Sequence, residues 1–256
     1  MKKQKHSALL RHIESLQGER PWGAMLDAGT GVNSLRWVSG LASERWTAVT
    51  GSAGEAERAR GAIGAALRPQ DRIVLGNWAD PDLLKGEAYD TVLADYVLGA
   101  VEGFAPYFQS YLFARLRPLT RGVLYVTGLE PYVHADRPEA GAERVVWEIG
   151  RFRDACILLA GDRPYREYPA PWVADHLQRA GFAVRDVKHF AIGYKEKFVT
   201  AQIEIALRGL EMLADQELAK PLEARGEALR AEALEMIAAE GALRGCRNYV
   251  IAAEPV

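Results

Sequence analysis

The stretch Ala24-Met25-Leu26-Asp27-Ala28-Gly29-Thr30-Gly31-Val32-Asn33 decides the fold of this chain. A short apolar run ends in an acid, two glycines alternate behind it, and apolar residues at helical spacing follow. This order predicts a strand, a tight turn and a helix. Because glycine has no Cβ, the backbone can turn sharply here and come close to a ligand, and the N-terminal amides of the helix point back at the turn. The turn suits a nucleotide-containing ligand, although two glycines also occur in many surface turns.

The composition is ordinary for a soluble globular protein, with 49% hydrophobic and 26% charged residues among 256. This length can bury a full core, and we expect a single domain over residues 1–256. The 32 basic and 34 acidic residues give a net charge of −2, which argues against a nucleic-acid partner. We find neither the apolar core of a signal peptide nor a run long enough to span a membrane. We therefore expect a cytoplasmic protein with no membrane partner.

The two cysteines of the chain, Cys156 and Cys246, lie far apart in the sequence. So low a count at this length excludes a disulfide scaffold, and the spacing is not that of metal ligands. We expect two free thiols and no metal site.

Strands alternate with helices through the first half of the chain. Strands are expected at residues 25–27, 46–50, 72–75, 89–95 and 123–127, and a single helix containing Phe104, Phe108, Leu112 and Leu116 is expected before the last of them. Such alternation predicts an open, doubly wound α/β sheet, in which ligands bind beyond the carboxyl ends of the strands. That rim would carry Asp27 to Gly31, Thr50, Asn77, Asp95, Tyr96 and Glu130.

The second half reads differently, with helices expected at 143–159 and 172–180 and strands at 182–192 and 248–253. Residues 195–240 are almost wholly helical by composition, and we expect an interruption near Pro221. This helical insertion before the last strand would serve as a lid or as the contact surface of a homodimer.

Five segments in series resemble the motifs of class I S-adenosylmethionine-dependent methyltransferases: residues 26–31, 49–60, 76–78, 89–96 and 116–126. The resemblance implies a Rossmann-like, mostly parallel seven-stranded sheet whose last strand is antiparallel, and S-adenosyl-L-methionine as cofactor. It implies that Asp27, Ala28, Gly29, Thr30 and Gly31 hold the methionine end of the cofactor. It further implies that Thr50 and Gly51 meet the ribose, that Asn77 and Trp78 meet the adenine, and that Asp95 and Tyr96 lie beside the transferred methyl group.

The chain departs from the family pattern at three positions. Thr50 stands where an acid usually grips both ribose hydroxyls, Asn77 where an aspartate is usual, and Asn33 where glycine is common. A hydroxyl can make one of the ribose bonds, and the asparagine oxygen can still accept from the adenine amino group. An NAD(P)-dependent oxidoreductase would need the acid and a third glycine. That class, and a non-catalytic binding protein with the methyltransferase fold, remain the alternatives.

The resemblance implies methyl transfer to a small-molecule oxygen, nitrogen or carbon nucleophile. Such a transfer is an in-line displacement on an activated group, so the protein mainly aligns the reactants and excludes water. A general base is needed only for an acceptor that is protonated at working pH. Glu130, Tyr132 and His134, which follow the fifth strand on the ligand side, are the candidate catalytic residues.

Overall fold

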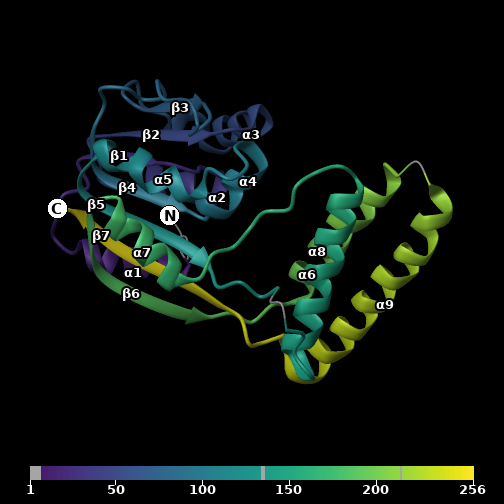
Figure 1. Ribbon diagram of the computed structural model, residues 1–256. Helices are drawn as coiled ribbons and strands as arrows, with labels where there is room; N and C mark the ends of the chain where they lie inside the picture. Colours follow the sequence, from purple (N-terminus) through teal and green to yellow (C-terminus); the bar gives the residue numbers. More distant parts are fainter. Residues whose placement is uncertain (1–6, 134–135, 214) are drawn as a thin grey trace. The chain divides into compact units, whose positions relative to one another are not determined.

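The computed structural model describes residues 7–133, 136–213 and 215–256 (Figure 1). The chain divides into two compact units. The first combines the chain up to Leu129 with Arg166–Phe190 and Asn248–Val256, and the second combines Glu130–Tyr165 with Ala191–Arg247. The single domain over residues 1–256 stays a prediction, and each unit is described by itself below.

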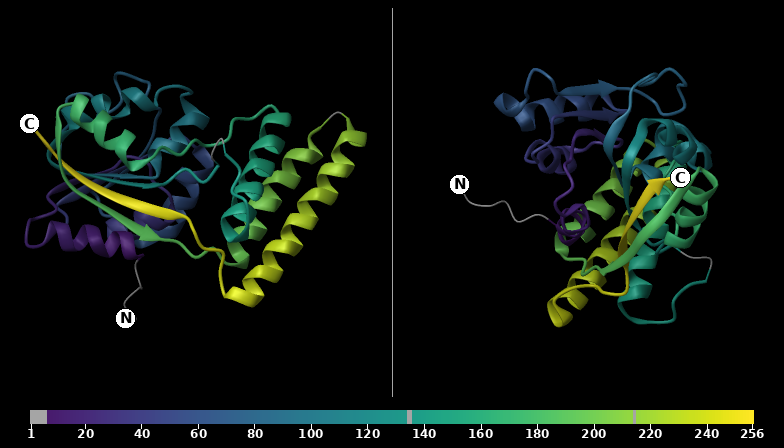
Figure 2. Two further views of the ribbon diagram at one scale, coloured as in Figure 1. Left: turned by 60° about the horizontal axis from the view of Figure 1, so that its bottom comes forward. Right: turned by 90° about the vertical axis from the view of Figure 1, so that its left-hand side faces the viewer.

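Within the described residues, seven strands form one sheet in the order β3-β2-β1-β4-β5-β7-β6 (Figures 1 and 2). The strands are β1 (Ala24–Asp27), β2 (Arg45–Thr50), β3 (Arg72–Leu75), β4 (Tyr89–Asp95), β5 (Thr120–Leu129), β6 (Phe182–Ala191) and β7 (Arg247–Pro255). The pairs from β3 through β5 are parallel, whereas β7 runs antiparallel to β5. The predicted fold class, a doubly wound and mostly parallel sheet whose last strand is antiparallel, is confirmed.

Both faces of the sheet are buried, because successive side chains of a strand point to opposite faces. Met25 belongs to a core cluster that includes Leu9, Leu35 and Ala59, whereas its neighbour Leu26 belongs to the other cluster. The first face is covered by α1 (Ala8–Gln17), α2 (Val32–Ser39) and α3 (Ala53–Ile63), and the second by α4 (Val97–Phe104), α5 (Gln109–Leu116) and α7 (Ala170–Arg179). Helices on both faces explain why the strands read as continuous apolar runs.

The single helix predicted between β4 and β5 is wrong, since the structure has two α-helices there, α4 and α5. Pro106 follows the end of α4 and lacks the N–H that a continuing helix needs. The residue before a proline is also biased away from the helical region, and Ala105 has φ −144° and ψ 77°.

The second unit contains α6 (Gly141–Leu159), α8 (Glu196–Glu211) and α9 (Gln216–Glu240), which pack against one another and lie side by side in Figure 1 and in the left view of Figure 2. Glycines allow close approach: a Cβ on Gly226 would lie 2.9 Å from the Phe152 ring. Helices α8 and α9 occupy the insertion expected before the last strand. The interruption predicted near Pro221 is wrong, because Pro221 lies inside α9. The helical region is instead interrupted between the end of α8 at Glu211 and the start of α9 at Gln216. Asp215 caps α9 by accepting hydrogen bonds from the amides of Glu217 and Leu218 at 3.0 and 3.1 Å.

Among the residues that the structure describes, none of the helices has the length and apolarity needed to cross a membrane.

Candidate functional site

The carboxylate of Asp27 is the central feature of the glycine turn. Asp27 ends β1, is fully buried, and neither of its oxygens accepts a hydrogen bond from the described residues. The nearby hydroxyl of Ser34 instead accepts from the Gly31 amide at 3.1 Å and donates to the Gly31 carbonyl at 3.1 Å. A buried acid without a partner is costly to a fold. The presence of this buried carboxylate in a glycine turn points to a ligand that is cationic or that donates a hydrogen bond.

The environment of Asp27 changes its acidity strongly. Burial raises the pKa of Asp27 to about 7, and the charge of Asp95 adds to the rise. The Thr30 and Ser34 hydroxyls and the Gly29 amide oppose it, because they lie near the carboxylate although none makes a hydrogen bond of good geometry to it. The acid is therefore poised near neutral pH, where a positive group placed beside it would favour the ionised form. Perturbed acids of this kind are common in binding sites.

The two glycines of the turn have different roles. A Cβ on Gly29 would lie 2.5 Å from Cβ of Val97, the first residue of α4, so Gly29 is required for packing. A Cβ on Gly31 would meet no atom within 4 Å, so the backbone there is open to a ligand. The amide of Thr30 donates to the Val49 carbonyl at 2.8 Å, which ties the turn to β2.

At the end of β4, Asp95 is held by a residue that the sequence reasoning missed. The Thr127 hydroxyl, on the neighbouring strand β5, donates to Asp95 Oδ1 at 2.5 Å. Burial raises the pKa of Asp95 and also that of the Tyr96 phenol, which stays protonated at neutral pH. Tyr96 adopts the left-handed conformation with φ 51°, and its amide donates to the Thr127 carbonyl at 3.2 Å. The sequence signal that could have identified Thr127 is its place at the end of the strand next to β4, because a hydroxyl there can reach Asp95.

The residues expected to meet the adenine already have intramolecular partners. Asn77 Nδ2 donates to the Phe104 carbonyl at 2.7 Å, and its Oδ1 accepts from the Ala79 amide at 3.0 Å. Trp78 is buried, and its indole N–H donates to the Ala28 carbonyl at 2.6 Å. This side chain therefore stabilises the glycine turn from within the core. The Trp78 N–H is thus not available to a ligand.

Next to the residues expected to meet the ribose, Thr50 and Gly51, lies a second residue that the sequence reasoning missed, Phe104 at the end of α4. A Cβ on Gly51 would lie 2.7 Å from Cδ1 of Phe104, so the ring rests directly on Gly51. Thr50 is buried next to it, and its hydroxyl accepts from the Ser52 amide at 3.3 Å, which leaves its proton free to donate. Phe104 is 41% exposed and lies outside both core clusters. The residues present therefore fit the methionine end of the implied cofactor, and at its expected adenosine end the Phe104 ring lies against Gly51.

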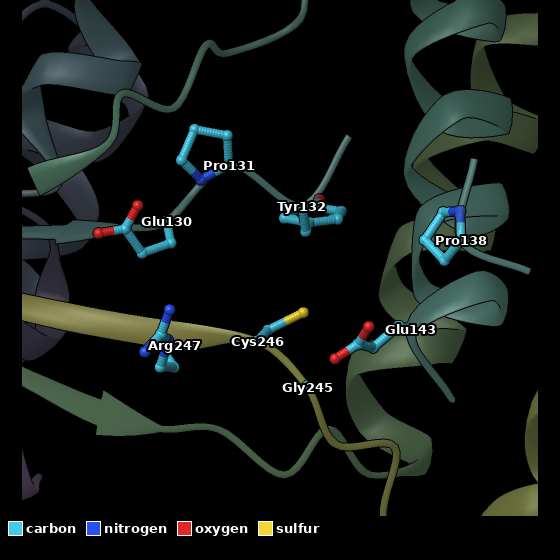
Figure 3. A pocket seen from close by; sticks show the side chains of 8 residues that line it. All are labelled: Glu130, Pro131, Tyr132, Pro138, Glu143, Gly245, Cys246 and Arg247. Atoms are coloured by element: carbon cyan, nitrogen blue, oxygen red, sulfur yellow. The ribbon is translucent and has the colours of Figure 1, made fainter. Parts of the chain in front are cut away.

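Two of the three candidate catalytic residues, Glu130 and Tyr132, lie in the second unit. Glu130 and Tyr132 line one pocket of about 180 Å³ there, shown in Figure 3, while His134 lies outside the described residues. The other residues that line it are Pro131, Pro138, Glu143, Gly245, Cys246 and Arg247.

The pocket is lined in part by the acidic residues Glu130 and Glu143, and hydrogen bonds hold several of its residues in place. The Glu130 amide donates to the Arg247 carbonyl at 2.9 Å, and the Tyr132 hydroxyl accepts from Arg153 Nη1 at 2.7 Å. Figure 3 shows the Cys246 thiol and the Glu143 carboxylate pointing toward each other. Burial raises the pKa of Cys246 to about 11, and the charge of Glu143 adds to the rise, so the thiol is not a nucleophile at neutral pH. Cys246 and Arg247 were not predicted, because they lie more than 100 residues from Glu130 and Tyr132 in the sequence; Glu143 was not predicted either.

Comparison with known proteins gives a structural answer only. No family model and no curated protein matches the sequence. A Bacillus halodurans protein assigned as a methyltransferase superposes with a TM-score of 0.60 at 14% identity, covering 97% of this chain and 99% of its own. The mycolic acid cyclopropane synthase CmaA1, solved with S-adenosylhomocysteine (SAH), gives 0.55 at 16% identity, covering 96% and 83%. The [4+2]-cyclase SpnF gives 0.55 at 17%, covering 96% and 80%.

The chain thus has the fold of the class I S-adenosylmethionine-dependent methyltransferases over nearly its whole length. At such low identity the match establishes the fold and leaves the reaction open, as the presence of a cyclase among the matches illustrates.

Proposed function

We propose that the protein binds S-adenosyl-L-methionine at the glycine turn and transfers a methyl group to a small-molecule nucleophile. The observation that carries this proposal is the buried, unpartnered carboxylate of Asp27 beside the open backbone of Gly31. The methionine end of the cofactor carries an ammonium group, which is the counter-charge that Asp27 lacks. When bound, the cofactor supplies a methyl group already activated on a sulfonium.

The residues of the chain would then bind and orient the reactants. Asp27 holds the ammonium group, the Thr50 hydroxyl donates one bond to the ribose, and Asn77 Oδ1 offers an acceptor at the adenine. Glu130, Tyr132 and His134 are proposed to position the acceptor and, where it is protonated, to take its proton. Helices α8 and α9 are proposed as a lid or a homodimer contact.

The first test is calorimetric titration of the full chain with SAH, with NADH titrated in parallel. We expect micromolar binding of SAH and no binding of NADH, since NADH lacks the ammonium group and brings a pyrophosphate beside Asp27. Binding of NADH instead would support the oxidoreductase. Binding of neither would contradict the proposal and favour a non-catalytic role.

Truncation of Phe104 is expected to strengthen cofactor binding. In Phe104→Ala the ring no longer rests on Gly51, so binding of SAH need not displace it, and we expect the affinity to rise about three- to tenfold, or roughly 1 kcal/mol. The side chain is outside the core clusters, so the thermal unfolding temperature should change little. The control is Phe108→Ala, which alters a core-packed phenylalanine after the same helix and should leave SAH affinity unchanged. Weaker binding in Phe104→Ala would show instead that the ring supports the bound ligand.

A further inference from the structure

Asp95, the last residue of β4, carries a second carboxylate on the same face of the sheet as Asp27. Asp27 of β1 is in register with Leu93 of β4, so their side chains point to the same face, and the side chain of Asp95, two residues after Leu93, points there as well. Asp95 therefore lies one strand step, roughly 6–7 Å, beyond Asp27. This step leads toward the carboxyl ends of the strands, where ligands of such sheets bind.

The Asp95 carboxylate is held at one oxygen and open at the other. The Tyr96 amide donates to the Thr127 hydroxyl at 3.2 Å, and this hydroxyl donates its own proton to Asp95 Oδ1 at 2.5 Å. Asp95 Oδ2 accepts no hydrogen bond from the described residues and is not enclosed by them. A ligand at this rim can therefore reach Oδ2, while Thr127 fixes the orientation of the group.

The two acids are not balanced by a cation of the chain. Among the residues that the structure describes, no arginine, lysine or histidine forms an ion pair with Asp27 or with Asp95. Burial is the main cause of the raised pKa of Asp27, and the charge of Asp95 adds to it, so the two carboxylates are close enough to repel each other. The ammonium group proposed for Asp27 supplies one positive charge. A second positive charge, one strand step beyond the first, would balance Asp95.

The proposed cofactor carries such a second charge. S-adenosyl-L-methionine has a positive sulfonium, separated from its ammonium nitrogen by three carbon atoms, a span of the same order as one strand step. SAH has a neutral thioether in its place. We propose that Asp95 is the specificity-determining residue of this site, and that its carboxylate makes the protein bind S-adenosyl-L-methionine in preference to SAH. Thr127 is a positioning residue, because it acts by orienting Asp95. This inference rests on the proposed cofactor site.

The test is calorimetric titration of the full chain at pH 8 with S-adenosyl-L-methionine, with SAH and with sinefungin, an analogue that carries an ammonium group in place of the sulfonium. We expect both charged ligands to bind at least tenfold more tightly than SAH. In Asp95→Asn, which keeps the acceptor for Thr127 but loses the charge, this advantage should fall below threefold, while the SAH affinity stays within threefold of the parent value. The matched control is Asp90→Asn, the same change near the other end of β4, which should keep the tenfold preference.

Two variants of Thr127 test its positioning role. Thr127→Val has the same shape without the hydroxyl and should reduce the preference for S-adenosyl-L-methionine at least threefold, whereas Thr127→Ser keeps the hydroxyl and should retain the preference. The SAH affinity of each variant reports whether the site is still folded, because SAH lacks the charge that Asp95 attracts.

The outcomes separate this inference from the cofactor proposal. Equal affinity of the parent protein for S-adenosyl-L-methionine and SAH, or a tenfold preference that survives in Asp95→Asn, would overturn this inference and leave the cofactor site in place. Failure of all three ligands to bind the parent protein would contradict the cofactor proposal, and this inference with it.

Discussion

The Asp27→Asn variant is expected to bind SAH at least 100-fold more weakly than the parent protein at pH 8, while unfolding at a higher temperature. Asparagine keeps the size of the side chain but loses the charge that would face the ammonium group of the ligand. Loss of a buried charge partner costs about 3 kcal/mol, which corresponds to about 100-fold in affinity. Calorimetric titration of both proteins between pH 6 and pH 8 measures the effect.

The stabilisation follows from the acidity of Asp27. The pKa of Asp27 is raised from its ordinary 3.8 to about 7, so the folded chain holds a proton that the unfolded chain has lost between these values. Stability therefore falls as pH rises through this window, by up to about 4 kcal/mol above pH 7. The variant avoids this loss, although its buried amide lacks partners, and we expect a net gain of about 1–2 kcal/mol at pH 8 and none near pH 4.

The pH dependence of binding gives an independent check. Because the ligand favours ionised Asp27, the SAH affinity of the parent should fall as pH drops below 7, by up to tenfold per pH unit. Binding should release a proton only from molecules in which Asp27 is still protonated, and that fraction is larger at pH 7 than at pH 8. The variant should show no such dependence. Asp90→Asn, at a β4 acid that accepts from the Ala24 amide at the opposite end of β1, is the control and should bind SAH normally. Equal SAH affinity of Asp27→Asn and the parent would contradict the proposed site.

The Glu148→Ala variant is expected to lower the free energy of unfolding of the second unit by about 2–3 kcal/mol at pH 7. Glu148 is buried on α6 and pairs with Arg137, with Arg144 at 2.9 Å, and with Arg225 of α9. Removing it leaves three arginines without this partner, and the effect stays below that of a fully buried pair because two of them are half exposed. Hydrogen–deuterium exchange of the α6 and α9 amides measures the loss.

The pH dependence of this effect runs opposite to that of Asp27. Burial opposes ionisation of Glu148, but the hydrogen bonds from Arg137 and Arg144 prevail and lower its pKa below the ordinary 4.5. The stabilisation is therefore complete above pH 4.5 and is lost as pH falls through the lowered pKa. The difference between Glu148→Ala and the parent should shrink toward pH 3. Glu232→Ala, which removes only a more exposed partner of Arg144, should cost less than about 1 kcal/mol. Unchanged exchange in Glu148→Ala would show that the arginines are satisfied without it.

The sequence predicts the sheet well because buried parallel strands leave uninterrupted apolar runs, and the bounds of β3 and β4 agree with expectation to the residue. The helical spacing of Phe104, Phe108 and Leu112 predicts one continuous helix, and Pro106, which lies between the first two of them, is the sequence feature that marks the break. The bracing role of Trp78 and the position of the Phe104 ring over Gly51 could not be predicted. Both depend on where α4 and the loop after β3 come to rest, and residue type and spacing alone do not determine that.

The strand order β5-β7-β6 has a consequence for how the protein is made. β6 is an edge strand that pairs only with β7, and β7 is the last of the strands to be synthesised. When β6 has been made and β7 has not, β6 therefore has no strand to pair with. Until β7 emerges, the edge of β5 and the whole of β6 present unpaired backbone groups, a condition that invites association with other chains. Loss of β7 would thus remove two strands from the sheet.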